Sequence, residues 1–520
     1  MMNASGFTLY DMLLRNALVH AGRTALVHEE DSLTFAGLLA RVDALAAGLA
    51  GIGISQGDRI CILAQNHMAY LELYGACAKL GAMAYPINWR LTGEEIGRVL
   101  ERAKPAMMLV DEFSLEQIGD WPATRKDIKL WYRIGGKGAG KDAGKDTGGL
   151  APLDGLYASQ AEAEALEAAD VDPGDAFCVI STAAVDVIPR GAVLTHANIL
   201  SSNVQTMALM GVNEADCNLV ALPLYHIAAL GMCLAVMHAG GCNVIMTRFD
   251  PERAVALIDR HKVTHISDFP PVLATLLDAA EKAGSALESL RMVSGLDAPD
   301  TIARLHRATG AKFWTGFGQS ETTGFVTLQP VEERPGAAGR PAPLCRIRLV
   351  DDFEREVPVG TPGEILVKGP VVFAGYYDQP EVNAHNFRGG WHHTGDVGRF
   401  DEDGYLHYVK RKPEKELIKP GGENVYPAEV EAVIMEMEGV AAVSVFGVPD
   451  AKWGEAIRAV VEGSGGTSGG ASLTGQAVMD HVGSRIASYK KPKTVVFTES
   501  LPTGEDGAID REAVKARWGE

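Results

Sequence analysis

Short apolar segments alternate with helical patterns along most of this chain, and this rhythm limits the folds that it can adopt. Residues 35–54 place apolar side chains at helical spacing and stop at a glycine, and residues 58–66 form a short apolar run typical of a buried strand. The same rhythm returns between residues 176 and 330. Alternation of this kind predicts α/β sheets with helices on their faces.

At 520 residues the chain is too long for one hydrophobic core, so two or more domains are expected. Short strands dominate residues 345–410, and a compact α/β segment follows residue 416. Between these blocks the charged run Lys410–Lys415 leads into Gly421 and Gly422. A short linker with few contacts lets backbone dihedrals change easily, which is what a hinge requires. The alternative is a surface hairpin with a solvated charge run.

The composition argues against several classes of function. A net charge of −19 disfavours a general nucleic-acid or membrane-surface binder, but it still permits a polyanionic small ligand in a locally basic or amide-lined site. The seven cysteines form no CxxC pair, which predicts neither a zinc site nor a disulfide framework. The N-terminus does not resemble a secretory signal, and the most apolar window, Ala228–Met246, predicts a buried helix and strand. We therefore expect a cytoplasmic protein without a membrane span.

The segment Gly135–Lys141 matches the start of a nucleotide-binding loop, G-x-x-x-x-G-K. Asp142 follows in place of the serine or threonine that would hold magnesium, and no apolar helix comes next. We interpret residues 135–149 as a surface loop.

A first candidate for nucleotide chemistry is Ser181–Asn198, which follows a predicted strand and precedes a predicted helix. This placement can aim backbone N–H groups at a phosphate, and Arg190 adds a fixed cation. Many α/β crossovers contain such a turn, so the signal is weak when taken alone.

Two further stretches carry suitable side chains. In Thr315–Glu321, glycines permit close approach to a flat ligand, Ser320 could bond a phosphate oxygen and Glu321 could hold Mg²⁺. Asp396 and Arg411 flank a strand hairpin and could converge on sugar hydroxyls. The ordinary alternatives are a glycine-rich turn ending in a solvated glutamate and a surface ion pair.

Taken together, the order and spacing of these stretches resemble the adenylate-forming superfamily of acyl-CoA synthetases, adenylation domains and luciferases. The matching segments are IPRGAVLTHAN (188–198), ALPLYH (221–226), GFGQSE (316–321), GTPGEILVKGPVVFAGYY (360–377), WHHTGD (391–396) and ELIKPGGENVYPAEVE (416–431). The resemblance covers roughly residues 10–515. The TAAV-x-x-x-PRG loop and KPEKELIKPGGENVYP are similar to those of bacterial feruloyl-CoA synthetases and related acyl-CoA ligases.

The resemblance implies an α/β fold with a large N-terminal multi-subdomain region, built from α/β sheets with helices plus a small β-barrel-like subdomain, and a small mobile C-terminal α+β domain. The expected boundaries are 1–411 for the AMP- and acyl-binding domain, 412–416 for the hinge and 417–520 for the mobile domain. It also implies an ATP-dependent carboxylate–CoA ligase that uses ATP, Mg²⁺ and coenzyme A. The substrate carboxylate would attack the α-phosphorus of ATP, and the CoA thiol would then attack the acyl-adenylate. A homodimer is compatible with this interpretation.

The same resemblance assigns roles to single residues. The ATP phosphates would be wrapped by Thr182 to Arg190, including Ala183 and Ala184, and Ser320 would contact phosphate. Adenine would be held by Gly295, Leu296, Asp297, Thr315, Gly316, Phe317 and Gly318. The ribose would be bound by Asp396 and Arg411, and Mg²⁺ by Glu321. The acyl-carboxylate site would be lined by Tyr225, His226, Gly295, Gly316 and Phe317, and the pantetheine thiol would be enclosed by Gly421 and Gly422.

This chain departs from the family pattern in the phosphate loop. Ala183–Val187 replace the usual glycines, β-branched residues restrict the backbone, and Asp186 places negative charge near an anion. We therefore expect weaker pyrophosphate binding. Two apparent extra residues near Pro413-Glu414 also leave the hinge position open between Lys412 and Glu416.

The larger departure is Ala508, which lies where the family carries a lysine that bridges the acyl carboxylate and the α-phosphate. Losing such a preorganised charge typically costs about 10²–10³ in rate, so adenylation is expected to be impaired. Because the neighbouring residues remain family-like, an engineered change is favoured over natural divergence.

The acid itself stays open at this stage. The acyl pocket is expected from segments 222–232, 265–272, 292–297 and 315–325, with Tyr225, His226, His265 and Phe317 available. An aromatic acid such as a hydroxycinnamate or benzoate fits the resemblance, and a fatty acid fits the apolar composition nearly as well. A compact dicarboxylate is disfavoured, since these segments carry no obvious extra arginine. The alternatives in function are an acyl-AMP ligase that loads a carrier protein and a catalytically impaired acyl-adenylate-binding protein.

Overall fold

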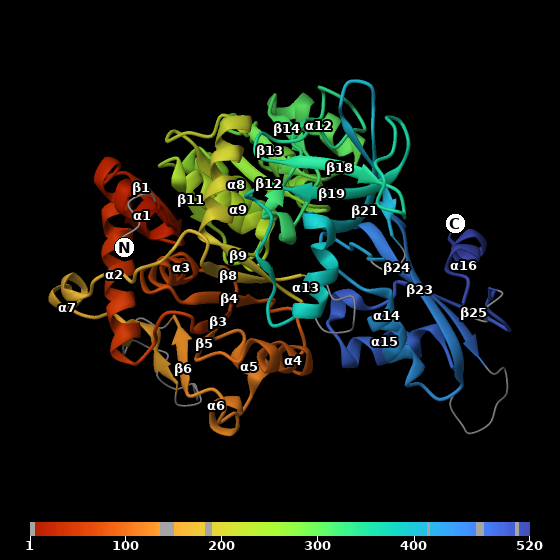
Figure 1. The fold of residues 1–520 in the computed structure, drawn as a ribbon, viewed down its shortest axis with the longest axis horizontal. Coiled ribbons are helices and arrows are strands. Elements are labelled where there is room, and N and C mark those ends of the chain that lie inside the picture. Colours follow the sequence, from red (N-terminus) through yellow and green to blue (C-terminus); the bar gives the residue numbers. More distant parts are fainter. Residues whose placement is uncertain are drawn as a thin grey trace.

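The computed structural model describes residues 6–135, 150–182, 190–412, 416–463, 473–504 and 509–519. Residues 6–412 are called the large domain below, and residues 416–519 the small lobe. Two eight-stranded sheets and a four-stranded sheet build the large domain, and a three-stranded sheet builds the small lobe (Figure 1). The mixed α/β fold with a large N-terminal part and a small C-terminal part confirms the expected fold class.

Sheet I pairs in parallel from β14 to β1 and carries one antiparallel strand at each edge. Its strands, in spatial order, are β17 (Gln329–Pro330), β14 (Lys312–Thr315), β13 (Met292–Gly295), β12 (His265–Asp268), β10 (Cys217–Val220), β11 (Cys242–Ile245), β1 (Thr24–His28) and β2 (Asp31–Thr34). Ligands of such sheets bind beyond the carboxyl ends of the parallel strands.

Sheet II is parallel from β8 to β7 and antiparallel at its other end. Its strands, in spatial order, are β20 (Gly375–Tyr376), β9 (Gly191–Thr195), β8 (Ala176–Ser181), β4 (Met83–Ile87), β3 (Arg59–Leu63), β5 (Met107–Asp111), β6 (Leu130–Ile134) and β7 (Ala151–Pro152). In β3, Ile60 and Ile62 pack into one core cluster and Cys61 and Leu63 into another. Both faces are therefore buried, which explains why this strand reads as a continuous apolar run.

Helices cover both sheets. The shared core between the sheets is formed by α1 (Leu9–Val19), α2 (Phe35–Gly51), α3 (Ala69–Leu80), α8 (His196–Met210) and α9 (Ile227–His238). The outer face of sheet I is covered by α10 (Pro251–His261), α11 (Val272–Ala283) and α12 (Pro299–Thr309), and that of sheet II by α4 (Gly93–Ala103). The remaining helices of the large domain are α5 (Leu115–Ile118), α6 (Trp121–Thr124), α7 (Gln160–Ala165) and α13 (Pro380–Asn386). Figure 1 shows α3, α8 and α9 in the middle of the large domain.

The strands expected as a small barrel form an open antiparallel sheet in the order β18 (Arg346–Val350), β19 (Gly363–Lys368), β21 (His392–Phe400) and β22 (Leu406–Arg411). The order does not close on itself, so this part of the expectation is corrected. A short hairpin, β15 (Gly318–Gln319) and β16 (Gly324–Phe325), lies near it in sequence.

The small lobe packs helices α14 (Pro427–Met435), α15 (Gly475–Arg485) and α16 (Arg511–Trp518) on the sheet β23 (Val440–Asp450), β24 (Gly454–Gly463) and β25 (Thr494–Thr498). All seven cysteines are free. None of the helices in the described ranges is both long and apolar enough to cross a membrane.

Candidate active site

Thr182 and Arg190, which border the expected phosphate loop, lie at the ends of the antiparallel strands β8 and β9. β9 is buried along almost its whole length, pairs antiparallel with β8 and separates the loop from α8 in the chain. The expected direct step from loop to helix N-terminus is therefore wrong. The N–H of Thr182 donates to the carbonyl of Arg190 (2.6 Å) and closes the hairpin. Ala183 and Ala184 lie outside the described residues.

Arg190 and Glu321 meet at one tyrosine. The Tyr376 hydroxyl donates to Oε1 of Glu321 (2.8 Å), and the Arg190 guanidinium lies 5.3 Å from the centre of the Tyr376 ring. Glu321 belongs to a short 3-10 helix, Ser320–Thr322. A cation and a carboxylate from distant segments thus both contact Tyr376, which sequence analysis did not single out.

The glycines before Glu321 are required by the chain's own backbone. A Cβ atom on Gly316 would lie 2.1 Å from the carbonyl oxygen of Thr327, and one on Gly318 would lie 2.1 Å from that of Gly324. Phe317 is buried, and its ring stacks on Tyr408 with 6.4 Å between centroids. Close strand contact therefore explains both glycines without any ligand.

Asp396 and Arg411 form an ion pair across β21 and β22, where they are register partners. Nε of Arg411 lies 3.1 Å from Oδ1 of Asp396, and Asp396 is 1% exposed. The Tyr408 hydroxyl donates to Oδ1 of Asp396 (3.2 Å), and the side-chain amide of Gln319 donates to Oδ2. The pair is therefore a buried, hydrogen-bonded group attached to the Glu321 segment, and not a surface ion pair.

The loop after β13 turns where sequence analysis expected adenine to bind. Gly295 has φ +154°, and a Cβ atom there would lie 1.9 Å from the carbonyl oxygen of Asp268. Leu296 is 58% exposed. Burial, followed by the nearby charge of Asp297, raises the pKa of Asp268 well above its usual range. Thr315 ends the adjacent strand β14, so the expected adenine residues come from neighbouring strand ends.

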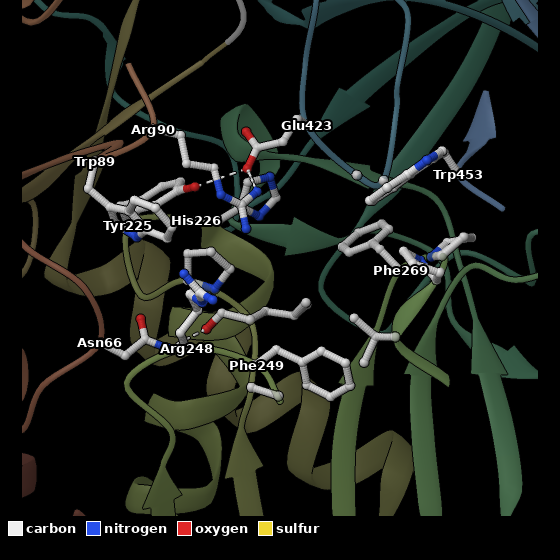
Figure 2. A pocket seen from close by; sticks show the side chains of 18 of the residues that line it. Asn66, Trp89, Arg90, Tyr225, His226, Arg248, Phe249, Phe269, Glu423 and Trp453 are labelled. Atoms are coloured by element: carbon white, nitrogen blue, oxygen red, sulfur yellow. Dashed lines mark hydrogen bonds and ion pairs between the residues drawn. The ribbon is translucent and has the colours of Figure 1, made fainter. Parts of the chain in front are cut away.

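A pocket of about 280 Å³ lies between the large domain and the small lobe (Figure 2). Tyr225, Arg90 and Glu423 meet at one end of it, and Phe269 and Trp453 lie at the other. The remaining lining residues are Asn66, Trp89, Ala221, Leu222, Pro223, His226, Thr247, Arg248, Phe249, Pro270, Pro271, Val272, Gly421 and Gly422.

His226 begins α9 and lies in the pocket wall. Its Nδ1 accepts a hydrogen bond from the N–H of Ala228 (3.1 Å), and its ring lies edge-on to Phe269 with 6.2 Å between centroids. Burial lowers the pKa of His226, and the neighbouring charge of Glu423 only partly offsets this effect. A neutral imidazole is therefore favoured.

Gly421 and Gly422 line the pocket from the side of the small lobe. Their φ angles are +59° and +83°, which favour glycine. A Cβ atom on Gly422 would lie 2.9 Å from the Phe269 ring, and one on Gly421 would lie 2.9 Å from the Trp453 ring. Phe269 belongs to the large domain, so the absence of a Cβ atom on Gly422 allows the two lobes to approach closely, whereas Gly421 makes room for Trp453 of its own lobe.

Two arginines of the pocket were missed by sequence analysis, because Arg90 and Arg248 lie outside the four segments expected to form it. His265 was expected to be available in the pocket, and this is wrong: it is fully buried in sheet I, with Nδ1 2.9 Å from Oδ1 of Asn218 and Nε2 2.9 Å from Oγ of Ser294. Asn218 and Ser294 hold both ring nitrogens, so His265 is a structural residue.

Lys419 was also missed. It precedes Gly421 by two residues, and part of its side chain is exposed. Surrounding protein atoms partly exclude water from its ammonium group, and this burial, followed by the nearby charge of Arg411, lowers the pKa of Lys419 to about 8. The charges of Asp396, Glu455 and Glu321 act on the pKa of Lys419 in the opposite direction.

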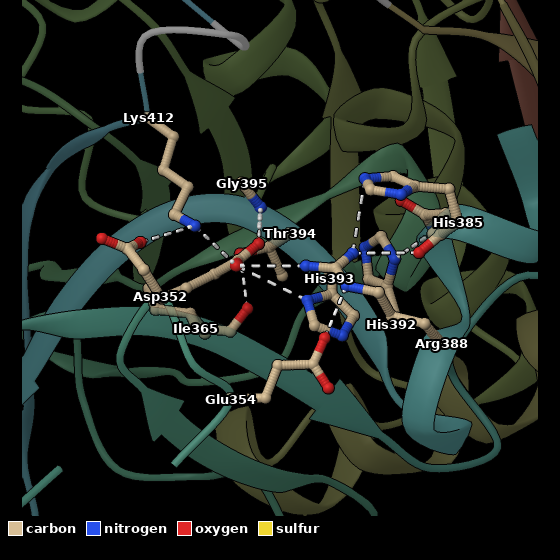
Figure 3. Close-up of polar contacts among 12 residues, drawn as sticks. Asp352, Glu354, Ile365, His385, Arg388, His392, His393, Thr394, Gly395 and Lys412 are labelled. Atoms are coloured by element: carbon tan, nitrogen blue, oxygen red, sulfur yellow. Dashed lines mark hydrogen bonds and ion pairs between the residues drawn. The ribbon is translucent and has the colours of Figure 1, made fainter. Parts of the chain in front are cut away.

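A second polar cluster connects β21, the strand that carries Asp396, to the end of the large domain (Figure 3). The buried carboxylate of Glu364 accepts the N–H of Gly395 (3.1 Å) and lies 3.0 Å from Nζ of Lys412 and 3.5 Å from Nδ1 of His393. Burial alone would raise the pKa of Glu364, but its hydrogen bonds to His393 and Lys412 hold that pKa at about 2. The last described residue before the small lobe is therefore fixed to the strand that carries Asp396.

Some expected positions cannot be placed. Ala508 lies outside the described residues, between Thr503 and Ile509, which form an isolated bridge. Residues 413–415 of the expected hinge also lie outside them. Within the described ranges, no group of three or more His, Cys, Asp or Glu side chains is arranged to hold a metal ion.

Sequence comparison finds two family matches. The family described as AMP-binding enzyme matches residues 13–377, and the AMP-binding enzyme C-terminal domain matches residues 429–507. The chain is 34% identical to a feruloyl-CoA synthase of an Amycolatopsis species, over 97% of this chain and 98% of that protein. It is 30% identical to an indoleacetate–CoA ligase of Aromatoleum aromaticum, over 98% and 97% of the two chains.

Three solved structures of one synthetase resemble this chain to different degrees. An o-succinylbenzoate-CoA synthetase double mutant from Bacillus subtilis, bound to its product analogue, superposes with a TM-score of 0.81 at 27% identity, over 98% of this chain and 99% of that one. The same synthetase in complex with AMP gives a TM-score of 0.66 at 26% identity, over 97% and 98% of the chains. Its complex with the acyl-adenylate gives 0.66 at 28% identity, over 98% and 99%.

Proposed function

Because the chain belongs to the AMP-binding enzyme family, and its homologues are CoA ligases, we propose that it is an ATP-dependent carboxylate–CoA ligase that works through an acyl-adenylate. The observation that carries the proposal is the arrangement around Glu321. The buried pair Asp396–Arg411 is bonded to Gln319 in the same turn, and Arg190 approaches through Tyr376.

In this proposal, the ribose hydroxyls bind Asp396 and Arg411, and the phosphates bind Thr182, Arg190, Ser320 and the loop with Ala183 and Ala184. Adenine lies on Gly295–Asp297 and Thr315–Gly318. No protein nucleophile is needed, so these residues act by positioning and by charge stabilisation. The acid carboxylate is directed by Tyr225 and His226, with Gly295, Gly316 and Phe317 behind it.

Glu321 suits Mg²⁺, because this ion is usually held by one or two carboxylates together with substrate phosphates, and no complete protein cage is required. Tyr376 bonds Oε1 of Glu321 and orients the carboxylate. When bound, Mg²⁺ would neutralise charge on the phosphates of ATP. Glu321 is the residue that would hold it.

The described arrangement suits the second step, in which the CoA thiol attacks the acyl-adenylate. Gly421 and Gly422 lie in the pocket wall against Phe269 and Trp453, where a narrow thiol arm could pass. The higher TM-score with the product-analogue complex supports the same view. The hinge at residues 412–416 would let the small lobe turn away for the first step.

For the acid, we propose an aromatic or arylalkanoic carboxylate. Five of the nineteen residues that line the pocket are Phe, Tyr or Trp, namely Trp89, Tyr225, Phe249, Phe269 and Trp453. A fatty acid is the alternative. Both Arg90 and Arg248 lie in this wall, so acids with a second carboxylate belong in the test panel.

The test is a pyrophosphate-release screen over hydroxycinnamates, benzoates, arylacetates, fatty acids and dicarboxylates, run on the protein as it stands and on Ala508→Lys. We expect the lysine to raise the rate by about 10²–10³, because it restores a preorganised charge at the α-phosphate. No gain with any acid would contradict the role assigned to position 508.

Thioester formation with free coenzyme A separates the acceptors. A product with coenzyme A supports the proposal, and acylation of an added carrier protein alone would favour an acyl-AMP ligase. Calorimetric titration with ATP and with a stable acyl-adenylate mimic separates an enzyme from a decayed pocket, which should bind neither.

A further inference from the structure

One short segment of the large domain receives the small lobe. Residues 88–95 run from the end of β4 into α4, and their side chains contact two separate parts of the lobe. The side-chain amide of Asn88 donates to Oε2 of Glu423 (3.1 Å), and Arg90 forms an ion pair with Oε1 of the same carboxylate. The Tyr225 hydroxyl donates to this oxygen as well (2.9 Å; Figure 2).

The second contact is a buried group of three charges. Nζ of Lys490 lies 2.5 Å from Oε1 of Glu95 and 2.6 Å from Oε1 of Glu429, and each of the three side chains is at most 5% exposed. Glu95 belongs to the large domain, whereas Lys490 and Glu429 belong to the small lobe. The N–H of Ala487 donates to the other oxygen of Glu95 (3.1 Å).

The two contacts have opposite polarity. At Arg90 the large domain supplies the cation and the lobe supplies the carboxylate, while at Glu95 the large domain supplies the carboxylate and the lobe supplies the cation. Exchanging or shifting the contacts would bring like charges together, so the pattern selects one orientation of the lobe.

We propose that Glu95 is a positioning residue for the thioester-forming step, because it captures Lys490 and so holds Gly421 and Gly422 against the pocket. This inference rests on the proposed two-step function. Glu95 does not reach the reacting atoms, and it acts through the orientation of the lobe.

The contact between Glu95 and Lys490 can form and break without leaving either charge without a partner. Away from the lobe, Glu95 still accepts hydrogen bonds from the N–H (2.7 Å) and the hydroxyl (2.9 Å) of Thr92, with which it caps α4. Away from the large domain, Lys490 still has Glu429. Glu95 therefore favours the docked orientation only through the contacts that it makes there with Lys490 and Ala487. Contacts that exist in one orientation and not in the other shift the equilibrium between the two orientations.

The test compares Glu95→Gln with Glu94→Gln. Glu94 lies in the same helical turn, but its carboxylate is exposed and pairs with Arg98 of its own helix. The first readout is single-turnover thioester formation from feruloyl-adenylate and coenzyme A, or from the adenylate of the best acid in the panel. We expect a loss of roughly 10- to 100-fold for Glu95→Gln, as for a lost charged hydrogen bond, and none for Glu94→Gln.

The second readout needs no turnover. Fluorescence energy transfer between one dye on each lobe should show a larger mean separation for Glu95→Gln than for Glu94→Gln, while calorimetry shows the same affinity for a stable acyl-adenylate mimic. Unchanged energy transfer, or a matching loss of mimic affinity, would overturn the proposal.

A double-variant cycle completes the design. Adding Glu95→Gln to Lys490→Gln should cost little more than Lys490→Gln alone if Glu95 acts through Lys490, and independent losses would contradict that route. If the proposed function is wrong, the results differ from those expected if only the role of Glu95 is wrong. The unsubstituted protein would then form no thioester, although Glu95→Gln would still change the energy transfer between the two lobes.

Discussion

Replacing Glu364 with glutamine tests whether the cluster in Figure 3 stabilises the fold as its contacts indicate. The folded-state pKa is about 2 against an ordinary 4.5, because the hydrogen bonds and charges of His393 and Lys412 outweigh the burial that would raise it. A tenfold change in proton affinity is worth about 1.4 kcal/mol, so the charged form is stabilised by roughly 3 kcal/mol at neutral pH. We expect Glu364→Gln to lower the free energy of unfolding at pH 7 by about 2–3 kcal/mol, since the amide oxygen can still accept the N–H of Gly395.

The pH dependence gives the sharper test. A depressed carboxyl pKa adds stability above the unfolded value, and this contribution is lost as pH falls through the folded value. The difference between wild type and Glu364→Gln in urea unfolding should therefore shrink to about half or less at pH 3. Glu354→Gln is the matched control, because Glu354 pairs with Arg388 in the same cluster but is about half exposed, and it should cost under about 1 kcal/mol. An equal difference at both pH values would refute the reasoning.

Two further substitutions test the cleft. Gly422→Ala should slow thioester formation by about tenfold or more but leave pyrophosphate release unchanged. The reason is that residue 422 has φ +83° and its new Cβ atom would meet Phe269. Equal effects on both half-reactions would count against this reasoning. The thioester-forming rate should fall as pH rises through about 8, where Lys419 loses its charge, and Lys419→Arg should move the inflection upward. An unmoved inflection would assign the pH dependence to another group. Since the folded pKa of Lys419 lies below its ordinary 10.5, stability should rise between about pH 8 and pH 10.5.

Sequence reasoning succeeded where the determinants are local. The alternation of apolar strands and helices predicted both large sheets, and the spacing of Asp396 and Arg411 on a hairpin predicted that they would converge. It failed at Gly191–Thr195, where a strand of five residues was absorbed into an expected loop. Short apolar segments after a turn fit a loop or an edge strand equally well, and only pairing with β8 decides between them.

Contacts between the lobes lay beyond such reasoning. Asn88 and Glu423 are 335 residues apart, and Glu95 and Lys490 are 395 residues apart. No local pattern marks either pair, because a glutamate in a first helical turn and a lysine before a proline-containing turn are ordinary surface features. The packing requirement at Gly316 and Gly318 was not foreseen for a related reason: a glycine indicates that something approaches the backbone closely, but the partner in that approach is visible only in the fold.

The pocket in Figure 2 exists only while both parts of the chain meet, since the large domain contributes Phe269 and the small lobe contributes Trp453 and the two glycines beside it. A truncated protein ending at residue 412 would lack one whole wall. Inhibitor or fragment screens should therefore use the full-length chain. A compound bound between Phe269 and Trp453 would hold the two lobes together if it is thin enough to fit, and would keep them apart if it is thicker.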